Sequence, residues 1–96
     1  MSLVEKLDHF AGAIGCAGAN APDEYADWSY VTYENNMAEI KETWAEIRPK
    51  LKRDLDKVEL IETKLQEAFA AFENGEKEVG RDAMWVIYNL EPTKLR

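Results

Sequence analysis

The sequence predicts an all-α protein that folds as a small four-helix up-and-down bundle. Apolar residues recur at alternating steps of three and four through most of the chain, which is the period of an amphipathic helix. Glycine and proline residues interrupt these runs at Gly18, Pro22, Pro49 and Gly75, and so divide them into separate helices. A chain of 96 residues has room for one domain, so we expect residues 1–96 to form a single helical domain.

The first predicted helix covers residues 2–17. Its apolar stripe consists of Leu3, Leu7, Phe10, Ile14 and Ala17. Three glycines, Gly12, Gly15 and Gly18, recur along the same segment. Each glycine inside a helix costs roughly 0.5 to 1 kcal/mol relative to alanine, so something should offset them. We expect the backbone of a neighbouring helix to approach closely along this row.

The second helix is predicted to begin at Pro22, because proline suits a first helical turn and the acidic residues Asp23 and Glu24 suit the positive end of the helix dipole. Its stripe is the longest in the sequence: Ala26, Tyr30, Tyr33, Met37, Ile40, Trp44 and Ile47. Residues 30–33 also have the composition of an extended segment, so a loop is the alternative for the first turns. The continuity of the stripe favours the helix.

The segment after Pro49 allows two architectures. The apolar phase continues through it, which would give one long kinked helix, with flanking helices, paired with a partner chain in a dimer. A turn between Pro49 and Leu55 is the other possibility, because proline disrupts a helix interior. Asp56 followed by Glu59 resembles a capping box, and Leu55 with Leu60 has the spacing of a hydrophobic staple. These local signals favour the turn.

The last two predicted helices are separated by Gly75. Glycine is typical of the left-handed position after a helix, so the third helix should end at Glu73 and Asn74. The fourth helix should end before Pro92. Its predicted apolar stripe consists of Val79, Ala83, Val86, Ile87 and Leu90. The short connections favour antiparallel neighbours.

The charge of the chain argues against nucleic acid as a direct partner. The formal net charge is −7, from 19 acidic and 12 basic residues. Residues 23–48 alone hold seven acidic residues against two basic ones. Nucleic-acid binding depends on Lys and Arg neutralising phosphates, so this sign excludes the usual mode of binding.

We expect a cytoplasmic protein without a membrane segment. No run of about 18 apolar residues occurs. The single cysteine, Cys16, cannot form an intramolecular disulfide, which is typical of a reducing compartment. The residues before Cys16 partly resemble the lipobox of exported bacterial lipoproteins, but Glu5, Lys6 and Asp8 interrupt the apolar run that such a signal needs.

The sequence contains no convincing catalytic or metal-binding motif. His9 and Cys16 lie seven residues apart on one predicted helix, about 10 Å along its axis, which is too far for a catalytic pair. Glu39, Glu42 and Glu46 occupy neighbouring turns, but the Glu-x-x-His motifs of di-iron bundles are absent. We therefore expect a non-enzymatic protein with no cofactor and no metal, in which these carboxylates form a solvated face.

The surplus of aromatic residues is the remaining functional signal. Trp28 lies outside the apolar stripe of its segment, and exposed Tyr and Trp side chains are typical anchors of protein interfaces. The alternative is that the rings cap one end of the bundle. The candidate partner-binding residues are Tyr25, Trp28, Tyr30, Glu39, Glu42 and Glu46.

Two functions are open at this point. The first is a cytosolic protein-interaction or regulatory module that binds a protein partner and forms a homodimer, because we expect 96 residues to cover two fully striped helices poorly. The second is an acidic inhibitor that occupies a basic, nucleic-acid-binding cleft of a target protein, as the acidic segment 23–48 would allow.

Overall fold

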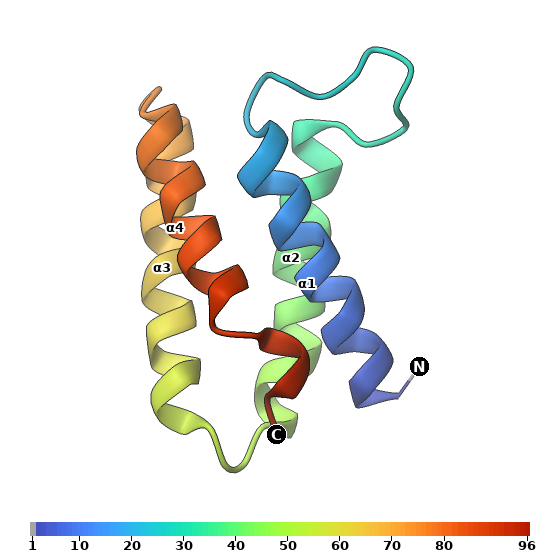
Figure 1. The fold of residues 1–96 in the computed structure, drawn as a ribbon, viewed down its shortest axis with the longest axis vertical. Coiled ribbons are helices and arrows are strands. Elements are labelled where there is room, and N and C mark those ends of the chain that lie inside the picture. The colour runs from blue at the N-terminus through green and yellow to red at the C-terminus, as the bar shows by residue number, and fades with distance from the viewer. Residues whose placement is uncertain (1) are drawn as a thin grey trace.

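The protein is a four-helix up-and-down bundle, as the sequence predicts (Figure 1). This computed structural model describes residues 2–96. Its α-helices are α1 (Leu3–Asn20), α2 (Tyr33–Ile47), α3 (Leu55–Glu73) and α4 (Lys77–Asn89). Two 3₁₀ turns, Arg48–Lys50 and Pro92–Lys94, follow α2 and α4.

The bundle consists of two helical hairpins that pack side by side. Helix α1 packs against both α2 and α4, while α3 packs closely against α4 (Figure 1). All four helices contribute to one buried core, in which Phe10 of α1 stacks on Trp44 of α2 at a centroid distance of 5.1 Å. Rings also join α2 to α3, because Tyr33 meets Phe72 edge to face. The stripes of α2 and α3 are therefore covered within one chain.

Helix α1 begins as expected and ends later than expected. Ser2 caps its first turn by accepting a hydrogen bond from the backbone N–H of Glu5, whose carboxylate accepts one from the serine hydroxyl. The helix continues past Ala17 to Asn20, and within this last turn Gly18 packs against the ring of Trp85. Aromatic side chains of α4 thus cover Gly15 and Gly18 but not Gly12, and the atoms nearest to these two glycines belong to rings instead of to the helix backbone that we expected.

The predicted start of the second helix is wrong. Residues 21–32 form a loop, and α2 begins only at Tyr33. Thr32 and Asn35 form a reciprocal capping box at this start: the threonine hydroxyl accepts from the Asn35 N–H, and the asparagine side chain accepts from the Thr32 N–H. Tyr30 is therefore exposed, although the sequence pattern placed it in a buried stripe.

The turn between α2 and α3 is present, so the long kinked helix is excluded. The capping box predicted at Asp56 is wrong, because Asp54 is the residue before the helix and its carboxylate accepts from the backbone N–H of Arg96. The backbone oxygen of Arg96 accepts from the N–H groups of Lys52, Arg53 and Asp54. The expected staple also fails, since the side chains of Leu55 and Leu60 are exposed.

The turn after α3 forms as predicted, with Gly75 in the left-handed region at φ 77°. Helix α4 is rotated relative to the prediction: it buries Gly80, Ala83, Met84 and Ile87, while Val79 and Val86 are exposed. This rotation follows from the packing of Phe72: its ring lies directly on Gly80, so the face of α4 that carries Gly80 is the one that meets α3. In residues 2–96, none of the helices has the length and apolar composition needed to cross a membrane.

Candidate interaction surface

Residues 21–32, here called the aromatic loop, project from one end of the bundle between α1 and α2 (Figure 1). Tyr25 fixes the loop from inside. Its hydroxyl donates a hydrogen bond of 2.5 Å to Oδ1 of Asn36, and Nδ2 of Asn36 donates one of 3.1 Å to the carbonyl oxygen of Ala13. Burial raises the pKa of the Tyr25 hydroxyl, so it remains a neutral donor. The loop, α1 and α2 are thus joined through a single buried amide.

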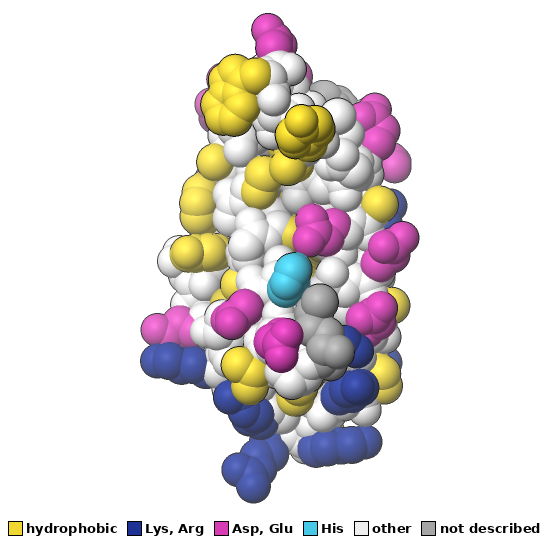
Figure 2. Space-filling view, turned by 90° about the vertical axis from the view of Figure 1, so that its right-hand side faces the viewer, with side chains coloured by type: hydrophobic (Ala, Val, Ile, Leu, Met, Phe, Trp, Pro, Cys, Tyr) yellow, Lys and Arg dark blue, Asp and Glu magenta, His cyan; other side chains and the backbone are white. Residues whose placement is uncertain are grey.

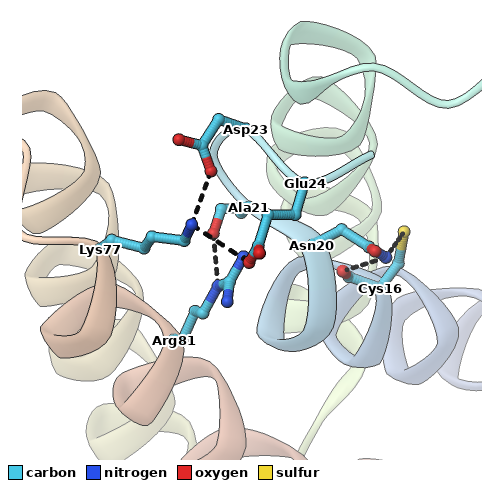
Figure 3. A network of polar contacts seen from close by, with 7 residues as sticks. All are labelled: Cys16, Asn20, Ala21, Asp23, Glu24, Lys77 and Arg81. Atoms are coloured by element: carbon cyan, nitrogen blue, oxygen red, sulfur yellow. Dashed lines mark hydrogen bonds and ion pairs between the residues drawn. The ribbon is translucent and has the colours of Figure 1, made fainter. Parts of the chain in front are cut away.

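Ion pairs fix the loop from outside (Figure 3). Lys77 of α4 reaches Asp23 at 2.8 Å and Glu24 at 3.1 Å, and Arg81 of α4 also pairs with Glu24. Nε of Arg81 donates a 2.6 Å hydrogen bond to the carbonyl oxygen of Ala21. These contacts attach the beginning of the loop to α4, a helix far away in the sequence.

The cations of α4 also change the acidity of both carboxyl groups. The hydrogen bond from Lys77 lowers the pKa of Asp23 below its ordinary value. The hydrogen bond from Arg81, followed by that from Lys77, lowers the pKa of Glu24. In turn, the bonds to Asp23 and Glu24 raise the pKa of Lys77. The pairs are therefore fully charged near neutral pH.

The tip of the loop presents two aromatic side chains to solvent. Trp28 is 86% exposed and Tyr30 is 96% exposed. The backbone that carries them is held by local hydrogen bonds: the Ser29 N–H donates to the Ala26 carbonyl, and Nδ2 of Asn35 donates to the Tyr30 carbonyl at 2.9 Å. Exposure here comes from a positioned backbone that directs both rings outward.

The six candidate residues from the sequence separate into three groups. Trp28 and Tyr30 are both exposed on the aromatic loop, whereas Tyr25 packs inward against the core. Glu39, Glu42 and Glu46 are exposed along α2. Glu46 lies 3.4 Å from Nζ of Lys6, and Glu39 lies 3.9 Å from Nδ1 of His9. Two of the three carboxylates thus have basic neighbours within the chain.

A groove of about 440 Å³ runs between α1 and α2 beside the aromatic loop. We call it the Gly12 groove. It is lined by Asp8, His9, Gly12 and Cys16 of α1, Val31 of the loop and Glu39 of α2. Figure 2 shows this side of the molecule: the histidine lies among acidic side chains, hydrophobic side chains stand out at the loop end, and Lys and Arg gather at the opposite end.

His9 and Cys16 line the same groove without approaching each other as a catalytic pair. They lie two turns apart on the continuous helix α1, about 10 Å along its axis. Nδ2 of Asn20 lies 3.7 Å from the sulfur of Cys16. Within residues 2–96, no group of three or more His, Cys, Asp or Glu side chains is placed to hold a metal ion.

Sequence reasoning missed three residues that shape this surface. Asn36 lies between the exposed Asn35 and the buried Met37, and its polar side chain gives no sign in the sequence that it is 1% exposed. Lys77 and Arg81 are four residues apart, so the sequence places both cations on one face of a helix. It does not show that Asp23 and Glu24 of the loop are the carboxylates they pair with. The spacing of Thr32 and Asn35 is the one local signal that could have located the end of the loop.

Comparison with protein-family models, with curated proteins and with solved structures gives no match for this chain. The surface must therefore be interpreted from its own geometry.

Proposed function

We propose that this protein is a cytosolic, non-catalytic interaction module that binds a protein partner through the tip of the aromatic loop. The exposure of Trp28 and Tyr30 on a loop fixed from both sides is the observation that carries the proposal. Large aromatic side chains gain most from being buried in a partner, and they are enriched among residues that dominate binding energy.

The fixed backbone adds to this advantage. Binding by a mobile loop loses free energy when the loop becomes ordered, whereas a positioned loop loses less. The contacts of Tyr25 with Asn36 and of Arg81 with Ala21 hold the loop at both of its sides before any partner arrives. Tyr25 thus supports the surface from within, and Trp28 and Tyr30 are the side chains that meet the partner.

A second candidate function is the acidic inhibitor of a basic cleft. It is favoured by the exposure of Glu39, Glu42 and Glu46 on one helix. Lys6 stands beside Glu46 at 3.4 Å, which weakens the potential that such a mimic would present. We therefore place it second.

The test begins with capture of the partner from native lysate on immobilised protein, followed by affinity measurements with the captured protein. Trp28→Ala should weaken binding by about 2 kcal/mol or more, about a thirtyfold rise in Kd, with only weak dependence on salt. Val79→Ala is the matched control, because Val79 is an exposed apolar residue on α4, outside the loop, and should leave Kd unchanged.

The acidic inhibitor predicts the opposite pattern. Its binding should weaken steeply as salt rises, because exposed charges are screened. It should also be lost when Glu39, Glu42 and Glu46 are replaced by Gln. An unchanged affinity of Trp28→Ala together with a steep salt response would overturn the aromatic interface in favour of the inhibitor.

Self-association remains part of the proposal. The stripes that first suggested a homodimer are buried inside one chain, so a dimer must use the outer surface instead. Trp28 and Tyr30 are the most exposed large hydrophobic side chains of residues 2–96 and would carry such a contact.

A further inference from the structure

The three glycines of α1 differ in what lies beside them. A Cβ added to Gly15 would meet the ring of Tyr88 at 3.2 Å, and one added to Gly18 would meet the ring of Trp85 at 2.8 Å. A Cβ added to Gly12 would meet nothing within 4 Å. Packing within the chain therefore explains the absence of a side chain at Gly15 and Gly18, but not at Gly12, where glycine weakens the helix without an internal gain.

What Gly12 does is keep the Gly12 groove open. Its missing side chain leaves space between α1 and α2, where the walls are mostly apolar and include Ala13 and Val31. Val31 belongs to the aromatic loop and is next to Tyr30, so the groove is continuous with the proposed interaction surface. A partner segment lying on the loop would pass over this opening.

The charged groups of the groove select the occupant. Asp8 and Glu39 both line it, from opposite helices. Glu39 has His9 as its neighbour at 3.9 Å, and among residues 2–96 no ion pair within 4.0 Å forms at Asp8. The lining thus combines apolar surface at Ala13 and Val31 with carboxylates, and it also includes the polar side chain of Asn36. This combination is complementary to a side chain with an aliphatic stem and a cationic head, which is the structure of lysine and arginine.

We propose that the Gly12 groove receives a lysine or arginine side chain from the partner segment that docks on the aromatic loop. This inference rests on the proposed function and names the chemistry of its partner. The stem of the side chain lies against Ala13 and Val31, and its cationic head lies between Asp8 and Glu39. The same carboxylates repel nucleic acid, and they repel the equivalent acidic face of a second copy.

The experiment uses N-acetyl-L-argininamide as a probe and N-acetyl-L-citrullinamide as its neutral analogue of nearly the same shape. The probe is titrated into ¹⁵N-labelled full-length protein at low salt, and backbone amide shifts are followed by NMR. We expect saturable shifts at the amides of residues 8–16 and 31–39 with a millimolar Kd, because one small cation in an open groove binds weakly. The citrulline analogue should bind at least about tenfold more weakly.

Two substitutions at Gly12 give the structural control. Gly12→Leu fills the groove with a side chain and should abolish the shifts. Gly12→Ala adds one methyl group and should retain them. Both replace a glycine in an exposed helical position, so a midpoint of unfolding equal to or above that of the wild type shows that the fold is intact. Shifts that survive Gly12→Leu, or that the citrulline analogue reproduces, would overturn the proposal.

The failure of this inference differs from the failure of the proposed function. Trp28→Ala should leave the probe's binding unchanged, because the ring is at the tip of the loop and not in the groove. If the probe does not bind while partner capture still depends on Trp28, only the groove assignment fails. If the probe binds and Trp28→Ala leaves partner capture unchanged, the aromatic interface fails. Self-association that Gly12→Leu abolishes would assign the groove to a second copy and overturn the proposed partner.

Discussion

The hydroxyl of Tyr25 donates a 2.5 Å hydrogen bond to the side-chain oxygen of Asn36, an amide that is 1% exposed. The same amide donates to the Ala13 carbonyl, so one buried side chain satisfies groups from the loop and from α1. Buried polar groups without partners are costly, and the Asn36 amide finds its partners in the Tyr25 hydroxyl and the Ala13 carbonyl. The pair therefore joins the aromatic loop to the stability of the bundle.

Asn36→Ala should consequently destabilise the protein by about 1 to 3 kcal/mol, because it removes the acceptor of the Tyr25 hydroxyl and the second hydrogen bond to the Ala13 carbonyl. Chemical denaturation measures this loss. Tyr25→Phe should cost about 1 kcal/mol, and the double variant should cost less than the sum, because the two residues share one bond. Asn89→Ala is the control, since Asn89 is exposed on α4 and its loss should stay within about 0.5 kcal/mol. Strict additivity of the two substitutions would contradict the shared bond.

Trp44 and Trp28 should respond to alanine substitution in opposite ways. Trp44 is 7% exposed and stacks on Phe10, so Trp44→Ala should destabilise the protein by roughly 3 to 5 kcal/mol. Trp28→Ala should change the free energy of unfolding by less than about 0.5 kcal/mol, because its ring is solvated. Urea denaturation of both variants checks this. A loss below about 1 kcal/mol at Trp44 would mean that its ring contributes little to the core.

The sequence predicted the parts of this fold that local chemistry decides. Gly75 terminates α3 because glycine readily adopts a positive φ, and Pro49 ends α2 because proline disrupts a helix interior. The stripe from Met37 to Ile47 is buried as expected, because its apolar residues recur with the period of a helix and so all lie on the face that meets the core.

The sequence did not predict the parts of the fold that depend on contacts between distant segments of the chain. The helical spacing of Ala26 and Tyr30 before Tyr33 continued a real stripe by coincidence, while ion pairs to α4 and the Thr32 cap hold residues 21–32 as a loop. The face of α4 was misassigned because Phe72 on another helix selects Gly80 as its contact. For the site, the residue types could be read from the sequence, but their exposure could not, because it depends on how the loop is anchored to α1, α2 and α4.

The glycines of α1 and α4 should separate by what surrounds them. Gly12→Ala should stabilise the protein by about 0.5 to 1 kcal/mol, because it improves the helix and meets only open space. Gly80→Ala should destabilise it by about 1 to 3 kcal/mol, because the new methyl group overlaps the buried Phe72 ring. Thermal or chemical unfolding decides both. A stabilised Gly80→Ala variant would show that Phe72 can move away without loss.

The ion pairs of the loop should make its attachment sensitive to acid. The pKa of Glu24 is lowered in the folded protein, chiefly by its bond with Arg81. A group with a lowered folded pKa contributes stability that is present above its unfolded pKa, about 4.3 for Glu, and lost as the pH falls through the folded value. The loop should therefore loosen only below about pH 4, as hydrogen exchange of its amides would measure.

The variant Arg81→Gln tests the cause of this acid sensitivity. An NMR titration of the Glu24 carboxyl should show its pKa rising toward the ordinary value in the variant. Lys64→Gln is the matched control, because it removes a cation that pairs with Glu67 on α3 instead of with the loop. An equal rise in both variants would mean that overall charge, and not the Arg81 contact, sets the acidity of Glu24.

Self-association through the loop tip should strengthen with salt. Each chain carries a net charge of −7, so two copies repel each other, and raising the ionic strength from about 0.1 M to about 1 M shortens the screening length from about 10 Å to about 3 Å. Contact between aromatic rings does not weaken under these conditions, since it depends on the removal of apolar surface from water.

Light scattering on a sizing column should therefore give a mass nearer to the dimer at high salt than at low salt. The double variant with Trp28→Ala and Tyr30→Ala should return the chain to the monomer mass. The contact of one cationic partner side chain with the groove would instead weaken slightly with salt, because a single exposed charge pair is screened while the aromatic contact is not. A monomer mass at every salt concentration would exclude the homodimer and leave the aromatic tip to a different protein.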